Sequence, residues 1–199
     1  KLPEFRPKLY DQISKRAGSY DVGDISNLTT ALSFEESKNQ RTRGAYIGGL
    51  LSLLTEKNHE LKKTTSLEID LNGREFPYLL YACKYVDTLK ISNVTGDYVG
   101  SYIANNNGNA GVISFHNIEG DMIGYGIARY NGNAKIISFN NVIGHNVGSW
   151  IASGKGYASV ISFNDVIGNR VGSWIAGGEG NAGVISFDKI EGNEVGYGI

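Results

Sequence analysis

The sequence predicts an all-β repeat protein, a parallel β-solenoid of about five 24-residue coils behind an α-helical N-terminal cap. Three observations predict it. A 24-residue unit recurs from Gly96 onward, and its cleanest copy, GNRVGSWIAGGEGNAGVISFDKIE, runs from Gly168 to Glu191. Identical residues return at fixed positions of successive copies, and the chain before residue 66 has helical periodicity instead. Repeat periods of 20–50 residues are typical of solenoids, propellers and arrays.

Residues 1–65 are expected to form the cap. Pro7 to Ala17 reads as a first helix, because Pro suits the first position of a helix and Gly18 ends it. Ser19 to Ile25 reads as a loop. The spacing in Ser33-Phe34-Glu35-Glu36 is that of a capping box and predicts the start of a second helical region.

The strongest helix signal runs from about Ala45 to Lys63. One face of this helix is apolar, and it carries Ile47, Leu50, Leu51, Leu54 and Leu61. Gly44, Gly48 and Gly49 weaken its start, at up to ~1 kcal/mol each relative to Ala.

At Thr65 the hydrophobic period changes from 3.6 to 2, which predicts a strand with Leu67, Ile69 and Leu71 on its buried side. Asn72-Gly73 predicts a turn. Residues 72–95 then read as a degenerate first coil, so residues 66–199 form the solenoid. Atypical terminal repeats are expected where an array meets its cap.

Each copy contains two strand-like pieces, exemplified by Val171 to Ala176 and Gly183 to Phe187. In the second piece Ile, Ser and Phe recur without change, at Ile113, Ile137, Ile161 and Ile185, at Ser114, Ser138, Ser162 and Ser186, and at Phe115, Phe139, Phe163 and Phe187. Parallel strands in register place like residues over like at ~4.8 Å. We therefore expect internal Ile and Phe columns, with Ser and the preceding residue outside.

Asn109, Asn133 and Asn181 share one repeat position and predict an asparagine ladder. The competing architecture is an antiparallel meander, with the Glu-Gly-Asn segments as hairpin turns. A meander does not require identical residues at every period, so the solenoid is favoured. Parallel crossovers are mostly right-handed, which favours a right-handed coil.

The bulk composition excludes some partners. The formal net charge is −1, which argues against nucleic acid and against an anionic membrane surface. Cys83 is the only cysteine, so no disulfide can form within the chain, and this leans towards a cytoplasmic compartment. No apolar run approaches the ~20 residues of a membrane span.

An aromatic column is the leading candidate binding site. Tyr102, Trp150 and Trp174 share one repeat position; in the other copies that position is Gly, and the ring moves one residue earlier, to Tyr125 and Tyr197. We expect the rings of the first three to lie outside the coil. Their structural role would be to cover Ile143 and Ile167 at a corner, and their functional role a platform for sugar rings or a protein partner.

A polar corner offers the other candidates. Asp121, His145 and His116 could meet at one edge, close to Glu119. The residue type changes from coil to coil, however, and Asx side chains at turns are explained by bonding to the backbone. The sequence contains no fixed-spacing metal motif and no catalytic motif, so it indicates no metal, no cofactor and no catalytic residue.

The sequence therefore favours a non-catalytic structural scaffold or interaction module. The alternative is a polysaccharide-binding or polysaccharide-cleaving β-helix protein that uses the aromatic column as a sugar platform. The expected partner is a protein or a carbohydrate. Because the chain stops within a repeat at Ile199, we also expect either further repeats or self-association through the C-terminal edge of the solenoid.

Overall fold

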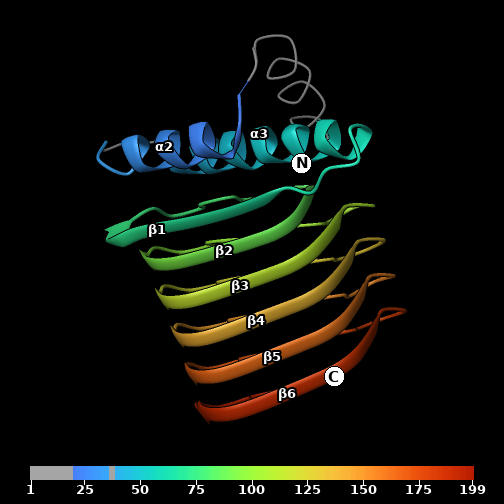
Figure 1. The fold of residues 1–199 in the computed structure, drawn as a ribbon. Helices are drawn as coiled ribbons and strands as arrows, with labels where there is room; N and C mark the ends of the chain where they lie inside the picture. Colours follow the sequence, from blue (N-terminus) through green and yellow to red (C-terminus); the bar gives the residue numbers. More distant parts are fainter. Residues whose placement is uncertain (1–19, 36–38) are drawn as a thin grey trace.

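The computed structural model describes residues 20–35 and 39–199, and it shows a β-solenoid of about five turns with two helices near its N-terminal end. Six strands pair in parallel, each with the next along the chain (Figure 1). They are β1 (Ser66–Glu75), β2 (Tyr85–Thr95), β3 (Asn109–Glu119), β4 (Asn133–Ile143), β5 (Tyr157–Ile167) and β6 (Asn181–Glu191). The parallel solenoid is confirmed and the meander is wrong. The hand of the coil stays a prediction.

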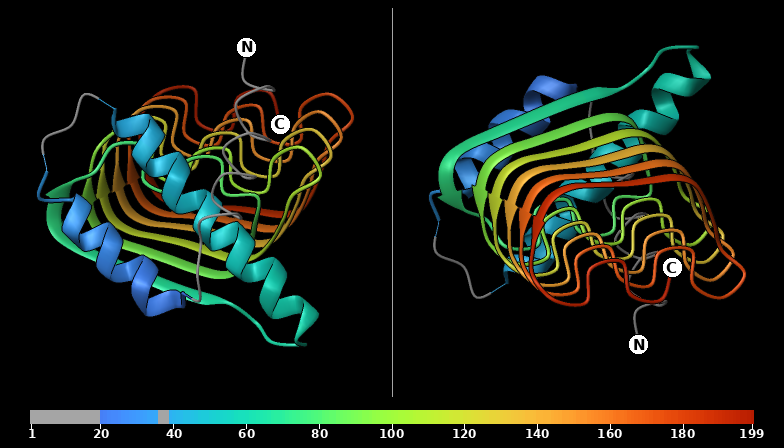
Figure 2. Two further views of the ribbon diagram at one scale, coloured as in Figure 1. Left: turned by 90° about the horizontal axis from the view of Figure 1, so that it is seen from above. Right: turned by 90° about the horizontal axis from the view of Figure 1, so that it is seen from below.

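Each coil has two unlike walls. Viewed along the axis, the coils overlay one another, with the strands forming one bent wall and the segments between strands a zigzag wall that faces it (Figure 2). We call these the strand wall and the turn wall; the turn wall comprises residues 76–84, 96–108, 120–132, 144–156, 168–180 and 192–199. The prediction of two strands per coil is wrong, because the Val171 to Ala176 piece lies in the turn wall and forms no strand.

The strand wall supplies the predicted internal columns. β3, β4, β5 and β6 pair with a register of 24 residues, which sets Phe115, Phe139, Phe163 and Phe187 over one another. Neighbouring Phe rings are parallel, with centroids 4.9 to 5.0 Å apart. The rings of the first three are almost fully buried, as are Ile113, Ile137 and Ile161 of the parallel Ile column. The expected in/out assignment of this strand is therefore confirmed.

The turn wall is built on alternate residues with positive φ. In one coil these are Asn146, Gly148, Trp150 and Ala152, with φ between 52° and 62°. The N–H of Trp150 donates to Ser173 of the following coil at 2.8 Å, and that of Ala152 donates to Ile127 of the preceding coil at 2.9 Å. The wall is thus held by hydrogen bonds that alternate in direction between the two neighbouring coils.

Packing against the Phe column requires glycine within this wall. A Cβ at Gly148 would lie 2.5 Å from the ring of Phe163 and 3.0 Å from that of Phe139. Its φ of 61° is also the left-handed conformation that costs other L-residues ~1–2 kcal/mol. A glycine at this position recurs in every copy of the repeat because the Phe rings fill the space that a side chain would need.

Two helices, α2 (Val22–Leu32) and α3 (Gln40–Glu60), cover the β1 end of the solenoid (Figure 1). Ile47, Leu50, Leu51 and Leu54 are buried in the same core as the strands, so the predicted apolar face is confirmed for these four. The prediction is wrong for Leu61, because this residue is the C-cap of α3 and its side chain is exposed. A Cβ at Gly44 would lie 1.8 Å from the carbonyl oxygen of Tyr78, so this glycine permits the close approach of α3 to the first coil.

The start of the cap differs from expectation. The predicted loop from Ser19 to Ile25 is wrong from Val22 onward, because α2 begins there. Asp21 and Asp24 form a reciprocal capping box at its start. Ser33 is the C-cap of α2 and does not start a helix. The predicted Pro7 to Ala17 helix lies outside the described residues.

The structure contains an asparagine ladder, at a different position from the one predicted. Asn141 donates its side-chain amide to Asn117 at 2.6 Å, and Asn117 donates to Asn93 at 3.0 Å. All three have positive φ, which Asn tolerates better than most residues. Asn109, Asn133 and Asn181 instead begin β3, β4 and β6.

Candidate functional site

The predicted aromatic residues gather on the outer side of the turn wall. The rings of Trp150 and Trp174 are stacked, with centroids 5.4 Å apart and planes 14° apart. Trp174 is 41% exposed and Tyr197 59%. Tyr102 touches Tyr125 edge-on at 5.6 Å, and Trp174 touches Tyr197 in the same way at 5.5 Å. We call this set of five rings the aromatic column.

The rings that move one residue earlier remain in the column. In a strand such a shift would send the side chain to the opposite face, but the turn wall is not a strand. The shift occurs where Gly126 and Gly198 leave room for the ring of the preceding coil. A Cβ at Gly126 would lie 3.1 Å from the ring of Tyr102, and one at Gly198 would lie 3.0 Å from that of Trp174.

A cation lies in the middle of the aromatic column. The guanidinium carbon of Arg129 is 4.7 Å from the ring centroid of Trp150 and 4.9 Å from that of Tyr130. Burial raises the pKa of Tyr102 to about 12, with further contributions from Tyr125 and Tyr81, and the positive charge of Arg129 opposes that rise. Burial also raises the pKa of Tyr125, and the positive charge of Arg129 again opposes the rise. The guanidinium thus contacts two neighbouring rings, and its charge acts on two further rings, those of Tyr102 and Tyr125.

Both faces of each indole ring are occupied within the molecule. Trp150 has Arg129 near one face and Trp174 stacked on its ring. Trp174 contacts the edge of Tyr197 and lies close to Gly198. A sugar platform requires a free ring face, whereas this arrangement presents mainly ring edges and the guanidinium to a ligand.

The indole rings do not cover the isoleucines that the sequence assigned to them. Ile143 is 46% exposed and Ile167 48%. They are the last residues of β4 and β5, where the strand wall meets the turn wall. The expected structural role of the tryptophans, shielding this pair, is therefore wrong.

The polar corner is a hydrogen-bonded ladder. Asp97 accepts the backbone N–H of Asp121, which accepts that of His145, each at 2.8 Å. His145 Nδ1 accepts the N–H of Asn169 at 3.1 Å, and Asn169 accepts that of Asn193 at 2.9 Å. Each side chain thus holds the backbone of the next coil. Among the described residues no group of three or more His, Cys, Asp or Glu side chains gathers to hold a metal ion.

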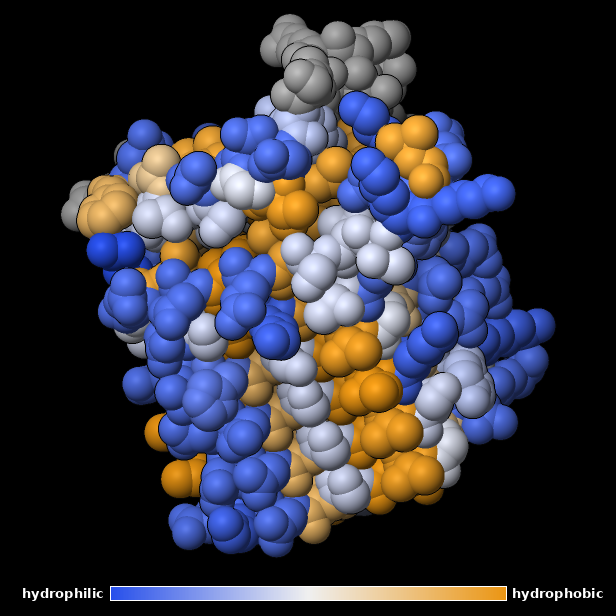
Figure 3. All heavy atoms as spheres, in the orientation of Figure 1, coloured by the Kyte–Doolittle hydropathy of each residue, from blue (hydrophilic) through white to orange (hydrophobic). Residues whose placement is uncertain are grey.

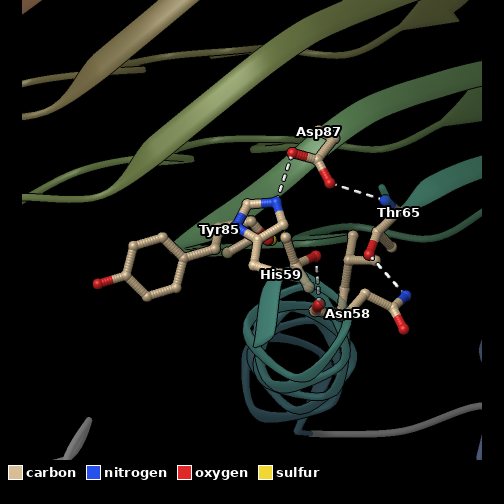
Figure 4. Close-up of polar contacts among 8 residues, drawn as sticks. Asn58, His59, Thr65, Tyr85 and Asp87 are labelled. Carbon is tan, nitrogen blue, oxygen red and sulfur yellow. Dashed lines mark hydrogen bonds and ion pairs between the residues drawn. The ribbon is translucent and has the colours of Figure 1, made fainter. Parts of the chain in front are cut away.

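A groove of about 570 Å³ lies between the C-terminal turns of α3 and the strand wall. His59 Nε2 lies 2.8 Å from Asp87 Oδ1, and Asp87 Oδ2 accepts the N–H of Thr65 at 2.7 Å (Figure 4). Asn58 donates to the hydroxyl of Thr65 at 3.0 Å. The partners lie far apart in the sequence, so no local motif could reveal this pair.

The residues that line this groove do not assemble a nucleophile and base. They are Glu56, His59, Glu60, Tyr85, Val86, Asp87, Asn109, Ala110, Gly111 and Lys135. Nucleophilic catalysis by a His–Asp pair needs a hydroxyl or thiol within hydrogen-bond reach of the imidazole. No Ser, Thr or Cys lines the groove, and the hydroxyl of Tyr85 points away from His59 (Figure 4). The pair instead ties the end of α3 to β2.

The outer side of the strand wall carries an apolar column, seen as the orange band that descends the face in Figure 3. In-register pairing aligns Val112, Ile136, Val160 and Val184 along it. A column of serines runs beside it, two residues further along each strand. This face is smooth and repetitive, and it holds none of the aromatic residues predicted as a binding site.

No helix of the described residues is long and apolar enough to cross a membrane. In comparisons with known proteins, no family model matches this chain, and neither a curated protein nor a solved structure matches it.

Proposed function

We propose that the protein is a non-catalytic interaction module, a rigid solenoid that presents the aromatic column of its turn wall to a protein partner. The observation that carries this proposal is the column itself: five Trp and Tyr rings and Arg129 on consecutive coils, with Trp174 and Tyr197 substantially exposed. Trp, Tyr and Arg are the residues most enriched at the energetic centres of protein interfaces.

The scaffold beneath the column supports this role. Each turn-wall residue that carries a ring is fixed by hydrogen bonds to neighbouring coils, as for Trp174, whose N–H donates to Tyr197 at 2.7 Å. The column therefore loses little conformational freedom on binding, and preorganised surfaces of this kind bind more tightly than mobile ones.

A carbohydrate ligand is the alternative. Stacked aromatic residues at intervals of one coil favour it, since extended sugar chains present apolar faces at regular spacing. The occupied faces of Trp150 and Trp174 weigh against it, because a sugar would have to displace Arg129 or bind to ring edges.

The test compares the wild-type protein with the double variant Trp150→Asn/Trp174→Asn. Asparagine is chosen because both positions have positive φ, 62° and 58°, which Asn tolerates. Both proteins are screened against a displayed library of random 12-residue peptides and against a glycan array. We expect the wild type to enrich peptides that the double variant does not retain, with thermal melts showing that the variant is folded.

Two results would count against the proposal. Enrichment of the same peptides by a folded double variant would move the binding surface elsewhere. Glycan binding by the wild type alone would favour the polysaccharide alternative. A matched control, Val160→Ser on the apolar column of the strand wall, should leave peptide binding unchanged because it lies on the opposite side of the coil.

Self-association through the β6 edge is a further proposal about partners. Ile185, Phe187 and Ile190 are only partly buried, whereas their equivalents in β5 are fully buried. An open core of this kind favours contact with another strand. Sedimentation velocity over a range of concentrations should show a dimer; a strict monomer at all concentrations would exclude this contact.

A further inference from the structure

Arg129 combines three features that make a guanidinium an anchor for an anion. It is held between the rings of Trp150 and Tyr130. It is partly buried within the aromatic column. No carboxylate lies within ion-pair distance of it among the residues that the structure describes, where five other ion pairs are seen.

The contacts around Arg129 fix its position and leave its hydrogen-bonding capacity available. A guanidinium that packs against a ring does so through its face, and its N–H donors lie in the plane of the group. No side-chain hydrogen bond of Arg129 is present within the described chain.

Another arginine of the turn wall provides the contrast. Arg170 forms an ion pair with Glu194 of the following coil through Nε. The positive charge of Arg170 is therefore already paired with a carboxylate, and the residue is exposed. Arg129 therefore differs from Arg170 in having aromatic neighbours and, within the described part of the chain, no carboxylate at ion-pair distance.

The geometry points to Arg129 as the carboxylate-binding anchor of the aromatic column, and to an acidic peptide segment of a partner protein as its ligand. This inference rests on the proposed function and specifies its partner. An Asp or Glu side chain would accept two parallel hydrogen bonds from the guanidinium. Apolar side chains beside it would pack against the exposed parts of Tyr130 and Trp174.

A carboxylate fits this site better than a phosphate does. Phosphate groups carry close to two negative charges and are usually met by clusters of basic residues. Here the cluster of rings contains a single cation, which matches the single charge of a carboxylate. The formal net charge of −1 also disfavours a nucleic acid as the source of the anion.

The experiment extends the selection of random 12-residue peptides to Arg129→Gln and Arg170→Gln. We expect peptides selected by the wild type and by R170Q to be enriched in Asp and Glu, and the enrichment to disappear with R129Q. A synthetic peptide made from the strongest wild-type sequence is then titrated against each protein by fluorescence anisotropy. R129Q should weaken its binding about tenfold or more, the range expected for losing a charge-assisted pair.

A double-mutant cycle supplies the specific readout. Replacing the conserved acid of that peptide by its amide should weaken binding to the wild type by a similar factor and should have little further effect on R129Q. R129K keeps the charge but loses the planar fork, and we expect intermediate affinity. Thermal melts of all variants exclude unfolding as the cause.

The outcomes separate this inference from the function on which it rests. Selected peptides without acidic enrichment, or an affinity that R129Q leaves unchanged, would overturn the carboxylate anchor while keeping the aromatic column as a binding surface. If the wild type selects no peptide that the Trp150→Asn/Trp174→Asn variant fails to select, both the anchor and the proposed function fail.

Discussion

The strand wall and the turn wall stack with the same 24-residue period, but residue identity is constrained for different reasons in the two. In the strand wall the backbone is ordinary β-structure, and the inward side chains are fixed by their neighbours above and below, as Phe139 is by Phe115 and Phe163. In the turn wall the backbone takes positive φ at every second residue, and residues are fixed by what that conformation and the nearby Phe rings allow.

This difference indicates which surface of such a protein can vary in its side chains from coil to coil. Outward residues of the turn wall are held rigidly by bonds in both directions along the stack, so their side chains can vary while their positions do not. Tyr102, Gly126, Trp150 and Trp174 occupy one position of this kind. The strand wall is more uniform, with Ser at the same outward position in four successive strands.

The largest effect is expected in the strand wall, from Phe163→Ala. The ring is buried between two parallel rings, and loss of a buried Phe side chain costs ~3–5 kcal/mol in the free energy of unfolding. Denaturant unfolding measures this loss. Phe187→Ala is the matched control and should cost less, because Phe187 is only partly buried and has one Phe neighbour. Equal losses at both positions would contradict the stacked-column account.

Gly148→Ala tests the turn wall. We expect a loss of about 2–4 kcal/mol in the free energy of unfolding, because the new Cβ meets the ring of Phe163 and the backbone stays left-handed. Gly73→Ala is the control: φ is 79°, but nothing lies within 4 Å of the new Cβ. It should cost only the conformational part, about 1–2 kcal/mol. If the two substitutions cost the same, contact with the Phe column does not constrain the turn wall.

Ser149→Ala compares serines on the two walls. The buried hydroxyl of Ser149 donates to the carbonyl of Arg170 at 2.6 Å, and its removal leaves that carbonyl without this donor. The expected loss is about 1–3 kcal/mol in the free energy of unfolding. Ser162 points outward from the strand wall between Ile161 and Phe163, so Ser162→Ala should cost less than ~0.5 kcal/mol. A larger loss at Ser162 would reverse the comparison.

The smallest effect concerns alkaline pH. The pKa of Tyr102 is raised to about 12, mainly by burial, so the neutral phenol is favoured in the folded state. A raised pKa contributes stability that is complete below pH ~10, the value for an unperturbed Tyr, and is lost as pH rises towards 12. Tyr102→Phe should therefore reduce the fall in melting temperature between pH 9 and pH 11.5. An unchanged fall would show that Tyr102 does not contribute, and Tyr20, whose pKa is also raised to about 12, would then be tested next.

The strand wall could be predicted from the sequence because its signal is direct. Identical Ile, Ser and Phe at every period indicate parallel strands in register, and alternation assigns their faces. The turn wall could not be predicted, because a backbone in which every second residue has positive φ also has a period of two. Val171 to Ala176 therefore reads as a strand. The signal that could have corrected it was the glycine within this piece, present in every copy and poor in a strand interior.

The candidate site was predicted only in part. The repeat position of Tyr102, Trp150 and Trp174 was enough to place these rings outside the coil, and the structure places them there. The stacking of Trp150 on Trp174 and the ring contacts of Arg129 depend on how side chains of neighbouring coils pack together, which the spacing does not encode. One feature of the sequence could have indicated the position of Arg129. Gly126 stands where other copies have an aromatic residue, and Arg129 follows three residues later.

The corner ladder from Asp97 to Asn193 has a mechanical consequence. Four of its side chains, those of Asp97, Asp121, His145 and Asn169, each accept a hydrogen bond from the backbone of the following coil. A force applied at the C-terminus would therefore load these contacts one at a time. Because each coil contacts mainly its neighbours, the chain should peel away coil by coil under tension. Each step would release about 80 Å of extended chain, from 24 residues at ~3.3–3.6 Å each. The final step would be different in kind, since α3 is packed on the first coil and both would have to come apart together.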